Sequence, residues 1–571
     1  MVSSCEVENG DLGTAQNGGA GSGQIGVLGA LSIGVGGIVG GGFFATFGLA
    51  VVGSRGSTYI SFLLGGVLAL LTAYSYVRLT LRYPGPAGTA GFVRRAFGRS
   101  LLPASVNVLL IYSYIAIMAV YAHALAAYAA SYLPADHQTA WLHLLSSAGI
   151  LLLGYINFAG AALMAKFESL FNIGKLAILA VFIGAGFLLG SPDWSRLGAE
   201  NFVPTTQIVS SGMIVFLAYE GFELISNASA RISNPEKTLP IAFYGSVASA
   251  IVIYVLAIVV AIGHMPFDAM KEAQNFALSA TAQQFMGSFG FALMTLGAVL
   301  ASASAINADF FGASKLPVML SEHGEMPSRF SREINGKHVV SMVFVGAIAL
   351  LCVNFVGLSE LSAATSGGFL IVYAVVNFAN AKLAHETRSH EWVPILAGLF
   401  CIVALGVTIY DFTRSAATMS SALAILAIAL LAIASEFAFC AFWPDRGAPD
   451  ANQPGAAPAP AGEATAFAWK GPAIAAAVLA VVAIGALPLV RNALSEKGGA
   501  PTPVNDQARQ PVDVAPATSP VAENAPARVV APEPQKASPA ETAPAAPAAI
   551  QKAGEARAAG AASKPRKKRK K

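Results

Sequence analysis

Long apolar stretches separated by short polar connections dominate the chain from residue 26 to residue 442. Each stretch holds about 20 residues, enough for one helix to cross a hydrocarbon layer roughly 30 Å thick. Lipid offers no hydrogen-bond partner to an open backbone, so such stretches have to form helices. We therefore predict twelve membrane-spanning helices, at 26–51, 58–80, 102–131, 141–162, 168–190, 207–229, 239–263, 287–311, 338–357, 361–381, 392–410 and 418–442.

The chain on either side of these stretches has a different composition. Residues 1–25 are polar and glycine-rich and lack the basic start and apolar core of a signal peptide, which predicts a disordered cytoplasmic N-terminus. A Pro/Ala linker at 443–470 precedes an apolar run at 471–490, for which we expect an additional transmembrane helix. Residues 491–571 are rich in alanine and proline and basic at their end, a composition typical of a disordered tail.

Composition agrees with a membrane protein and narrows the chemistry. The 571 residues are 55% hydrophobic and only 12% charged, and the mean hydropathy is +0.61, which exceeds what a water-soluble chain of this length needs. The four cysteines are not spaced like a metal site or a disulfide framework, and the chain has no Walker A loop and no zincin motif. We expect no bound metal, no cofactor, no nucleic-acid partner and no enzymatic activity.

Basic residues in the predicted loops give the orientation. The loops on one side hold most of them, including Arg94, Lys237 and Lys337. The loops on the other side hold only Arg55, Arg196, Lys271 and Arg414. Because basic residues are retained on the cytoplasmic side, we predict a multi-pass protein of the inner (plasma) membrane with a cytoplasmic N-terminus.

The first predicted span contains a glycine run that disfavours a continuous helix. It reads Gly36-Gly-Ile-Val-Gly-Gly-Gly-Phe-Phe44, and each interior glycine costs about 0.5–1 kcal/mol of helix stability relative to alanine. A break at Gly40, Gly41 and Gly42 would place the amides of Gly41 and Gly42 at the positive end of a second half-helix, which suits a carboxylate. Carbonyls before the break, near Ile38, could accept hydrogen bonds from an ammonium. The alternative is close helix packing through small residues.

The sixth predicted span has a matching interruption. Its centre, Phe216-Leu-Ala-Tyr-Glu-Gly-Phe-Glu223, holds two carboxylates and a glycine within an apolar run. Ile38 and Ala218 both fall near mid-bilayer, and the two spans run in opposite directions. Paired interruptions of this kind are typical of the central site of transporters built from inverted repeats. Glu220 and Glu223 would not both ionise comfortably in a low-dielectric interior unless a cation is nearby.

Four motifs resemble those of amino acid permeases of the amino acid/polyamine/organocation (APC) superfamily. They are the glycine run of the first span, Phe216 to Pro240 with its trailing N-P-x-x-x-x-P, Pro84 to Ala90, and Gly312 to Leu316. The resemblance covers about 25–442 and implies an all-α polytopic membrane protein with the five-plus-five inverted-repeat transporter fold and two accessory helices. It assigns residues 26–442 to a twelve-helix amino acid permease domain.

Position by position, the resemblance also implies a binding site. The substrate's carboxylate would lie on the amides of Gly41 and Gly42, which follow Gly40. Its ammonium would meet main-chain carbonyls of the two interrupted spans, namely those of Ile38, Leu217, Ala218 and Glu220. Tyr219 would form an aromatic wall or gate, and a lipid-facing or core tyrosine is the alternative.

Two ionisable residues are candidates for proton coupling. Lys175 in the fifth span matches a lysine of proton-coupled relatives, and the alternative is a side chain that snorkels to the membrane interface. Glu223 matches an acidic position linked in relatives to proton release or to the gate. Asp309 and Lys315, near the end of the eighth span, are expected at the cytoplasmic gate or in a surface pair rather than at the substrate site.

The resulting functional prediction is a secondary active transporter that imports an amino acid by proton symport and alternating access. Its partners would be the amino acid, the proton and the lipid bilayer. An amino acid/amine exchanger and a non-transporting membrane amino acid sensor are the alternatives. The apolar character of the third, eighth and tenth spans favours a neutral or hydrophobic substrate, and neither the identity of the amino acid nor the oligomeric state follows from the sequence.

Overall fold

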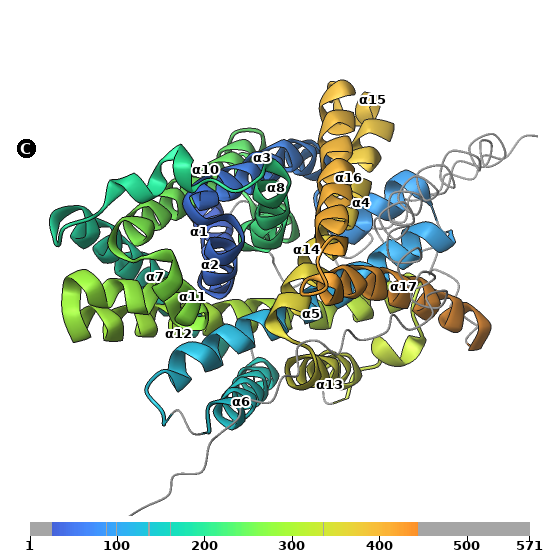
Figure 1. Cartoon of the computed structure of the whole chain (residues 1–571). Helices are drawn as coiled ribbons and strands as arrows, with labels where there is room; N and C mark the ends of the chain where they lie inside the picture. Colours follow the sequence, from blue (N-terminus) through green and yellow to red (C-terminus); the bar gives the residue numbers. More distant parts are fainter. Residues whose placement is uncertain are drawn as a thin grey trace, which may run out of the picture. The chain divides into compact units, whose positions relative to one another are not determined.

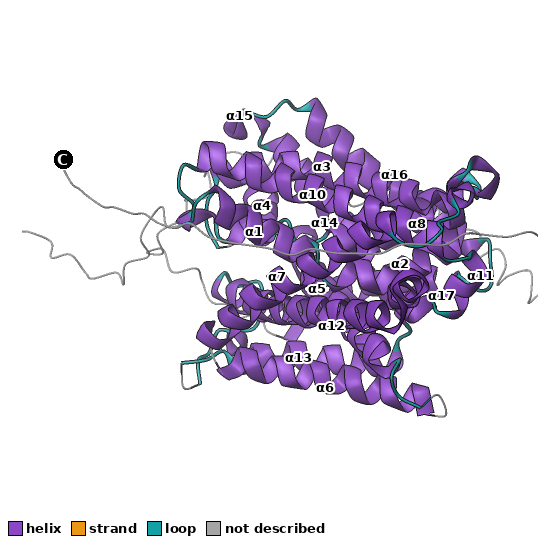
Figure 2. Ribbon diagram, turned by 90° about the vertical axis from the view of Figure 1, so that its left-hand side faces the viewer, coloured by secondary structure: helices purple, strands orange, loops and turns teal. Residues whose placement is uncertain are grey.

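The computed structural model describes residues 25–442, except 87, 99, 135–136, 160 and 335. Helices make up most of the described chain, which contains no extended strand (Figures 1 and 2). Ten of its helical segments are long and apolar enough to cross a membrane, and Val27–Ile38 and Val339–Phe355 are shorter apolar helices. The predicted all-α, multi-pass membrane protein is therefore confirmed.

The helices follow the predicted spans, with the first and sixth spans each divided into shorter pieces. They are α1 (Val27–Ile38), α2 (Gly41–Ser54), α3 (Thr58–Arg82), α4 (Gly88–Phe97), α5 (Leu101–Ala130), α6 (Gln138–Ala159), α7 (Ala161–Leu188), α8 (Thr205–Ile214), α9 (Leu224–Asn227), α10 (Pro235–His264), α11 (Phe267–Glu272), α12 (Ala277–Glu322), α13 (Val339–Phe355), α14 (Leu358–Lys382), α15 (Ala384–Thr387), α16 (Trp392–Thr413) and α17 (Met419–Phe442).

Two groups of packed helices surround the first span. Helices α3 and α10 form one group, in which α10 also packs on α1 and α3 contacts α8. Helices α5, α6, α12 and α13 form the other, and α6 and α13 lie side by side in both views (Figures 1 and 2). Because α2 contacts α8 as well as α5 and α12, the first span lies between the two groups. The five-plus-five repeat within this arrangement stays a prediction.

The N-P motif after the sixth span determines how α10 begins. Asn234 adopts a left-handed conformation with φ of +46°, and Pro235 occupies the first helical position, where a missing amide hydrogen costs nothing. Just before it, Ile25 pairs with Ile232 in a short parallel bridge, in which the amide of Ile25 donates to the carbonyl of Arg231 at 3.0 Å. The start of the first span is thereby joined to the end of the sixth.

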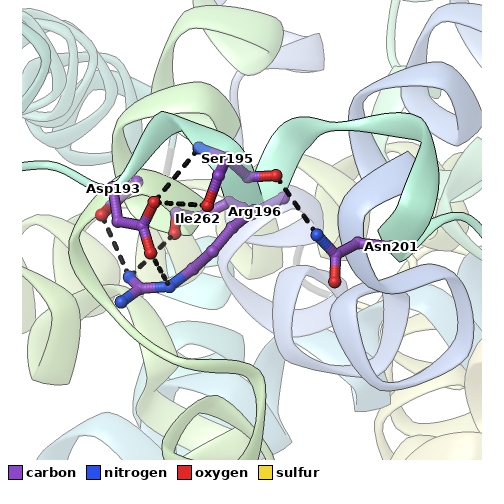
Figure 3. Close-up of polar contacts among 6 residues, drawn as sticks. Asp193, Ser195, Arg196, Asn201 and Ile262 are labelled. Atoms are coloured by element: carbon purple, nitrogen blue, oxygen red, sulfur yellow. Dashed lines mark hydrogen bonds and ion pairs between the residues drawn. The ribbon is translucent and has the colours of Figure 1, made fainter.

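A polar cluster fixes the loop between α7 and α8 (Figure 3). Arg196 donates to the carbonyl of Gly263, the next-to-last residue of α10, at 3.0 Å and lies 3.4 Å from the carboxylate of Asp193. The hydroxyl of Ser195 donates to Asp193, and this hydrogen bond lowers the pKa of the Asp193 carboxyl. Asp193 therefore stays ionised at neutral pH as a partner for Arg196, which holds the loop on the end of α10.

Several predicted regions lie outside the described residues. These are nearly all of the N-terminal segment 1–25, the linker 443–470, the additional span 471–490 and the tail 491–571. The cytoplasmic location of the N-terminus also stays a prediction, because the arrangement of helices alone does not orient them in a membrane.

The turn before α12 packs directly on α2 at Gly48. A Cβ atom added to Gly48 would lie 2.0 Å from the carbonyl oxygen of Gln274 and 2.8 Å from its carbonyl carbon. Both atoms belong to the backbone of the turn Gln274–Phe276, so no side-chain rotation can relieve the clash. Glycine at residue 48 is what allows this turn to cover α2.

We predict that Gly48→Ala destabilises the protein by about 1–3 kcal/mol, because the turn must shift away from α2. Thermal and denaturant unfolding of the detergent-purified full chain measures the change. Gly184→Ala on α7 is the matched control, because a Cβ there meets no atom within 4 Å, and it should be neutral or stabilising by up to about 1 kcal/mol. Equal unfolding midpoints for the two variants would contradict the described contact.

Candidate functional site

The first span is broken at the predicted glycines. Helix α1 ends at Ile38, α2 begins at Gly41, and Gly40 between them has an extended backbone with φ of −105° and ψ of −154°. No side chain caps the start of α2. The amides of the first turn, which include those of Gly41 and Gly42, therefore have no partner within the helix and face the break with the positive end of the helix dipole.

The sixth span is broken as well, over a longer stretch. Helix α8 ends at Ile214, a 3₁₀ turn covers Val215–Tyr219, and the helix resumes only at Leu224. Between them Glu220 is extended, with ψ of 150°, and Gly221 has φ of +113°. That φ is strained for any residue with a side chain, so the glycine between the two carboxylates is what permits the turn.

The two breaks touch each other. A Cβ atom on Gly221 would lie 2.6 Å from the carbonyl carbon of Gly37, and one on Gly42 would lie 2.9 Å from the Cα atom of Ala218. These contacts join backbone to backbone without an intervening side chain. The interruptions of the first and sixth spans are thus at the same level of the bundle, as the sequence predicts.

Tyr254 on α10 connects the two breaks through one hydroxyl group. Its oxygen lies 2.8 Å from the carbonyl oxygen of Ile38 and 2.9 Å from that of Ala218, so the two carbonyls share its one hydrogen as donor. The ring stacks on Phe43 with centroids 4.5 Å apart, which fixes the hydroxyl in place. The sequence analysis did not identify Tyr254, because it belongs to no motif and lies in an otherwise apolar span.

The other predicted residues of the sixth span have distinct surroundings. The carbonyl of Leu217 accepts a hydrogen bond from the amide of Glu220 at 3.3 Å and is used within the turn. The hydroxyl of Tyr219 donates to the carbonyl of Phe62 on α3 at 2.8 Å, and its ring is fully buried against Tyr254. These surroundings are typical of a core tyrosine, which was the alternative to an aromatic wall or gate.

Lys175 contacts the broken first span. Its side chain is completely buried, and the ammonium donates to the carbonyl of Gly36 at 2.7 Å. Asn172, one turn earlier on α7, also lies against Gly36, where a Cβ atom would come within 2.6 Å of its amide nitrogen. Because Lys175 is buried against α1, it does not extend to a membrane interface, which was the alternative to a coupling role.

Glu223 is surrounded by donors. Its Oε1 atom accepts a hydrogen bond from Tyr114 at 2.7 Å, and its Oε2 atom accepts from the amide of Gly221 at 2.9 Å and from Tyr373 at 3.0 Å. Tyr114 lies on α5 and Tyr373 on α14, so the carboxylate joins both helices to the broken sixth span. Three donors stabilise a buried carboxylate without a cation.

Asp309 and Lys315 do not form the surface pair considered from the sequence. Asp309 is 5% exposed, and its charge interacts with that of Glu223. Lys315 instead lies 3.5 Å from the ring centre of Phe311. The surface pair is wrong because the rotation of α12, which turns Asp309 inward, depends on packing against distant helices. The cytoplasmic gate stays a prediction.

The start of α2 is bordered by one further polar group that the sequence analysis missed. Ser302 on α12 is fully buried, and its hydroxyl has no hydrogen-bond partner among the described residues. A Cβ atom on Gly41 would lie 3.0 Å from this hydroxyl and 2.9 Å from the ring of Tyr121. Free amides and a free hydroxyl suit an anion, whereas the carbonyls of Ile38 and Ala218 suit a cation. The arrangement is able to bind both ends of a zwitterion.

Comparison with known proteins agrees with this geometry. The family model described as amino acid permease matches residues 25–433. An uncharacterized protein of Methanocaldococcus jannaschii is 29% identical over 370 residues, covering 65% of this chain and 84% of that protein. The inner membrane transport protein YbaT of Escherichia coli is 28% identical, covering 63% and 83%, and the methylthioribose transporter of Bacillus subtilis is 24% identical, covering 64% and 84%.

We predict that Tyr254→Phe destabilises the protein by about 1–3 kcal/mol, because two buried carbonyls lose their shared donor while the stacked ring is kept. Unfolding of the detergent-purified full chain measures the effect. Tyr132→Phe is the control, since Tyr132 is 59% exposed, and the expected change there is within about 0.5 kcal/mol. A Tyr254→Phe protein as stable as the control would mean that the hydroxyl does not support the breaks.

Proposed function

Because this chain belongs to the amino acid permease family, we propose that it imports an amino acid across the inner membrane as a secondary active transporter coupled to protons. The observation that carries the proposal is the direct contact between two broken spans, Gly37 with Gly221 and Gly42 with Ala218. The printed name of the Escherichia coli relative supports the choice of membrane. Transport would proceed by alternating access around this fixed site.

The substrate's carboxylate would bind at the start of α2. The amides of Gly41 and Gly42 are free of helical partners there, and the unpartnered hydroxyl of Ser302 lies next to Gly41. A helix N-terminus with an additional hydroxyl donor favours an anion, and the surrounding burial strengthens the interaction. A side chain at Gly41 would clash with Tyr121 and Ser302, and one at Gly42 would clash with the backbone of Ala218, so either would disturb the start of α2.

The ammonium would bind on the other side of the breaks, at the carbonyls of Ile38 and Ala218. The carbonyl oxygens share the single hydroxyl hydrogen of Tyr254, so both keep lone-pair capacity for a substrate N–H. The carbonyl of Leu217 is engaged within its turn, so its contribution would be smaller than the sequence implied. Glu220 lies beside the same break and adds negative charge.

Lys175 would couple transport to the proton. Its ammonium holds the carbonyl of Gly36 directly before the break, so protonation strengthens a contact between α7 and α1 that a neutral amine would weaken. A change in this contact would therefore alter how tightly the first span is held. Glu223 is a second candidate for proton exchange, although its three donors already stabilise it as a carboxylate.

We predict accumulation of labelled amino acid in vesicles that contain the purified full chain and carry an inward proton gradient. Gly41→Val should reduce uptake to background, because its side chain would clash with Tyr121 and Ser302 and displace the amides at the start of α2. Binding without accumulation would favour the sensor. Uptake that requires preloaded internal substrate would favour the exchanger.

We predict that Lys175→Met abolishes the response of uptake to the proton gradient, because methionine fills the space but binds no proton. The measurement is initial uptake with and without an imposed pH difference. Lys271→Met on α11 changes an exposed lysine and should leave the response intact. Proton coupling through Lys175 is refuted if the two variants respond alike.

A further inference from the structure

Three carboxylates are buried beside the broken spans. Glu220 is 2% exposed, Glu223 is 1% exposed and Asp309 is 5% exposed. The charge of Asp309 interacts with those of both glutamates. Among the residues that the structure describes, none forms a salt bridge with any of the three. Three charged carboxylates would be unfavourable together in a low-dielectric interior unless protons or a cation neutralise them.

The three carboxyl groups differ in how fully their oxygens are hydrogen-bonded. Glu223 is fully engaged by Tyr114, Tyr373 and a main-chain amide. In contrast, the Oε1 atom of Glu220 and the Oδ2 atom of Asp309 have no hydrogen-bond partner within the described part of the chain. Buried polar atoms usually have a partner in folded proteins, so these two oxygens, which lie beside the broken spans, are able to accept hydrogen bonds from a ligand.

Asp309 continues the same surface that borders the start of α2. On α12, Ser302 faces Gly41, and a Cβ atom on Gly40 would lie 3.2 Å from the Cβ atom of Ala305. Asp309 follows on this helical face, seven residues beyond Ser302, which corresponds to about 10 Å along the axis. Tyr121, which lies against Gly41, is also within the electrostatic influence of Asp309.

The cluster does not fit a metal ion. Within the described residues, no group of three or more histidine, cysteine, aspartate or glutamate side chains is arranged to hold one. Lys175 is a buried cation of the same region, and its ammonium donates to the carbonyl of Gly36. An organic cation that enters with the substrate is a positive group that these oxygens can bind.

We propose that the substrate carries a second cation, an ammonium or guanidinium at the end of its side chain, and that Asp309 and Glu220 bind it. This inference rests on the proposed function, because the α-carboxylate must lie at Gly41 for the side chain to reach Asp309. Asp309 lies about 10 Å along α12 beyond Ser302, and this spacing favours a long basic side chain over a short neutral one. It revises the neutral substrate favoured by the apolar sequence of the eighth span.

The test compares pairs of amino acids that differ only in charge, using the purified full chain. Lysine is compared with norleucine, and arginine with citrulline, first by thermal stabilisation and then by competition with labelled uptake in vesicles. We expect each cationic member to bind at least about ten-fold more tightly than its neutral partner, since buried unpartnered groups discriminate strongly. Equal affinity within both pairs overturns the inference and indicates that the carboxylates are neutralised by protons instead.

Single substitutions test whether Asp309 is responsible for the preference for a cationic amino acid. Asp309→Asn should weaken lysine binding at least about ten-fold and change norleucine binding less than about three-fold, whereas Asp309→Glu should restore part of the preference. Asp268→Asn, which alters an exposed carboxylate on α11, is the control and should keep the preference. An equal loss for lysine and norleucine overturns the assignment of Asp309. The wild-type comparison decides the inference even if Asp309→Asn fails to fold.

The outcomes separate this inference from the proposed function. Accumulation of norleucine or citrulline without any preference for the basic amino acids leaves the transporter intact and removes the cation site. If neither neutral nor basic amino acids bind or accumulate, the proposed function and the inference both fail.

Discussion

A backbone interrupted inside a membrane must satisfy its hydrogen bonds without water, and this requirement organises the centre of the molecule. The hydroxyl of Tyr254 serves carbonyls of both broken spans, at Ile38 and Ala218. Lys175 serves the carbonyl of Gly36, and the carboxylate of Glu223 accepts from a main-chain amide within the second break. The polar side chains of neighbouring helices are thus placed where the two breaks need partners, whereas no side chain caps the amides at the start of α2.

Close approach of two main chains sets the geometry of the site. Gly37 and Gly221 lie in direct backbone contact, as do Gly42 and Ala218, and at each glycine an added Cβ atom would lie within 3.0 Å of main-chain atoms. A Cβ atom does not fit at distances this short, which is why glycine stands at residues 37, 42 and 221. The glycines therefore do more than weaken the helices. They allow polar main-chain groups from two antiparallel segments to converge on one small volume.

The features predicted correctly from the sequence are those that depend on residues close together in the chain. The glycine run identified the break before Gly41, and apolar length identified the spans, because both depend on neighbouring residues. Contacts between residues far apart in the chain could not be predicted from such local patterns. Tyr254 lies in an apolar span without a motif, and Asp309 was assigned to a gate or surface pair because the rotation of α12 is set by other helices. For the same reason Lys175 could be placed in a span, but its contact with Gly36 could not be foreseen.

The parallel bridge between Ile25 and Ile232 has a consequence for affinity. Together with the shared hydroxyl of Tyr254, it links the first and sixth spans at two separate levels. Segments linked in this way lose most of their conformational freedom during folding rather than when a ligand arrives. A small molecule entering between them would not have to order a loose loop, so its few contacts would translate more fully into binding strength.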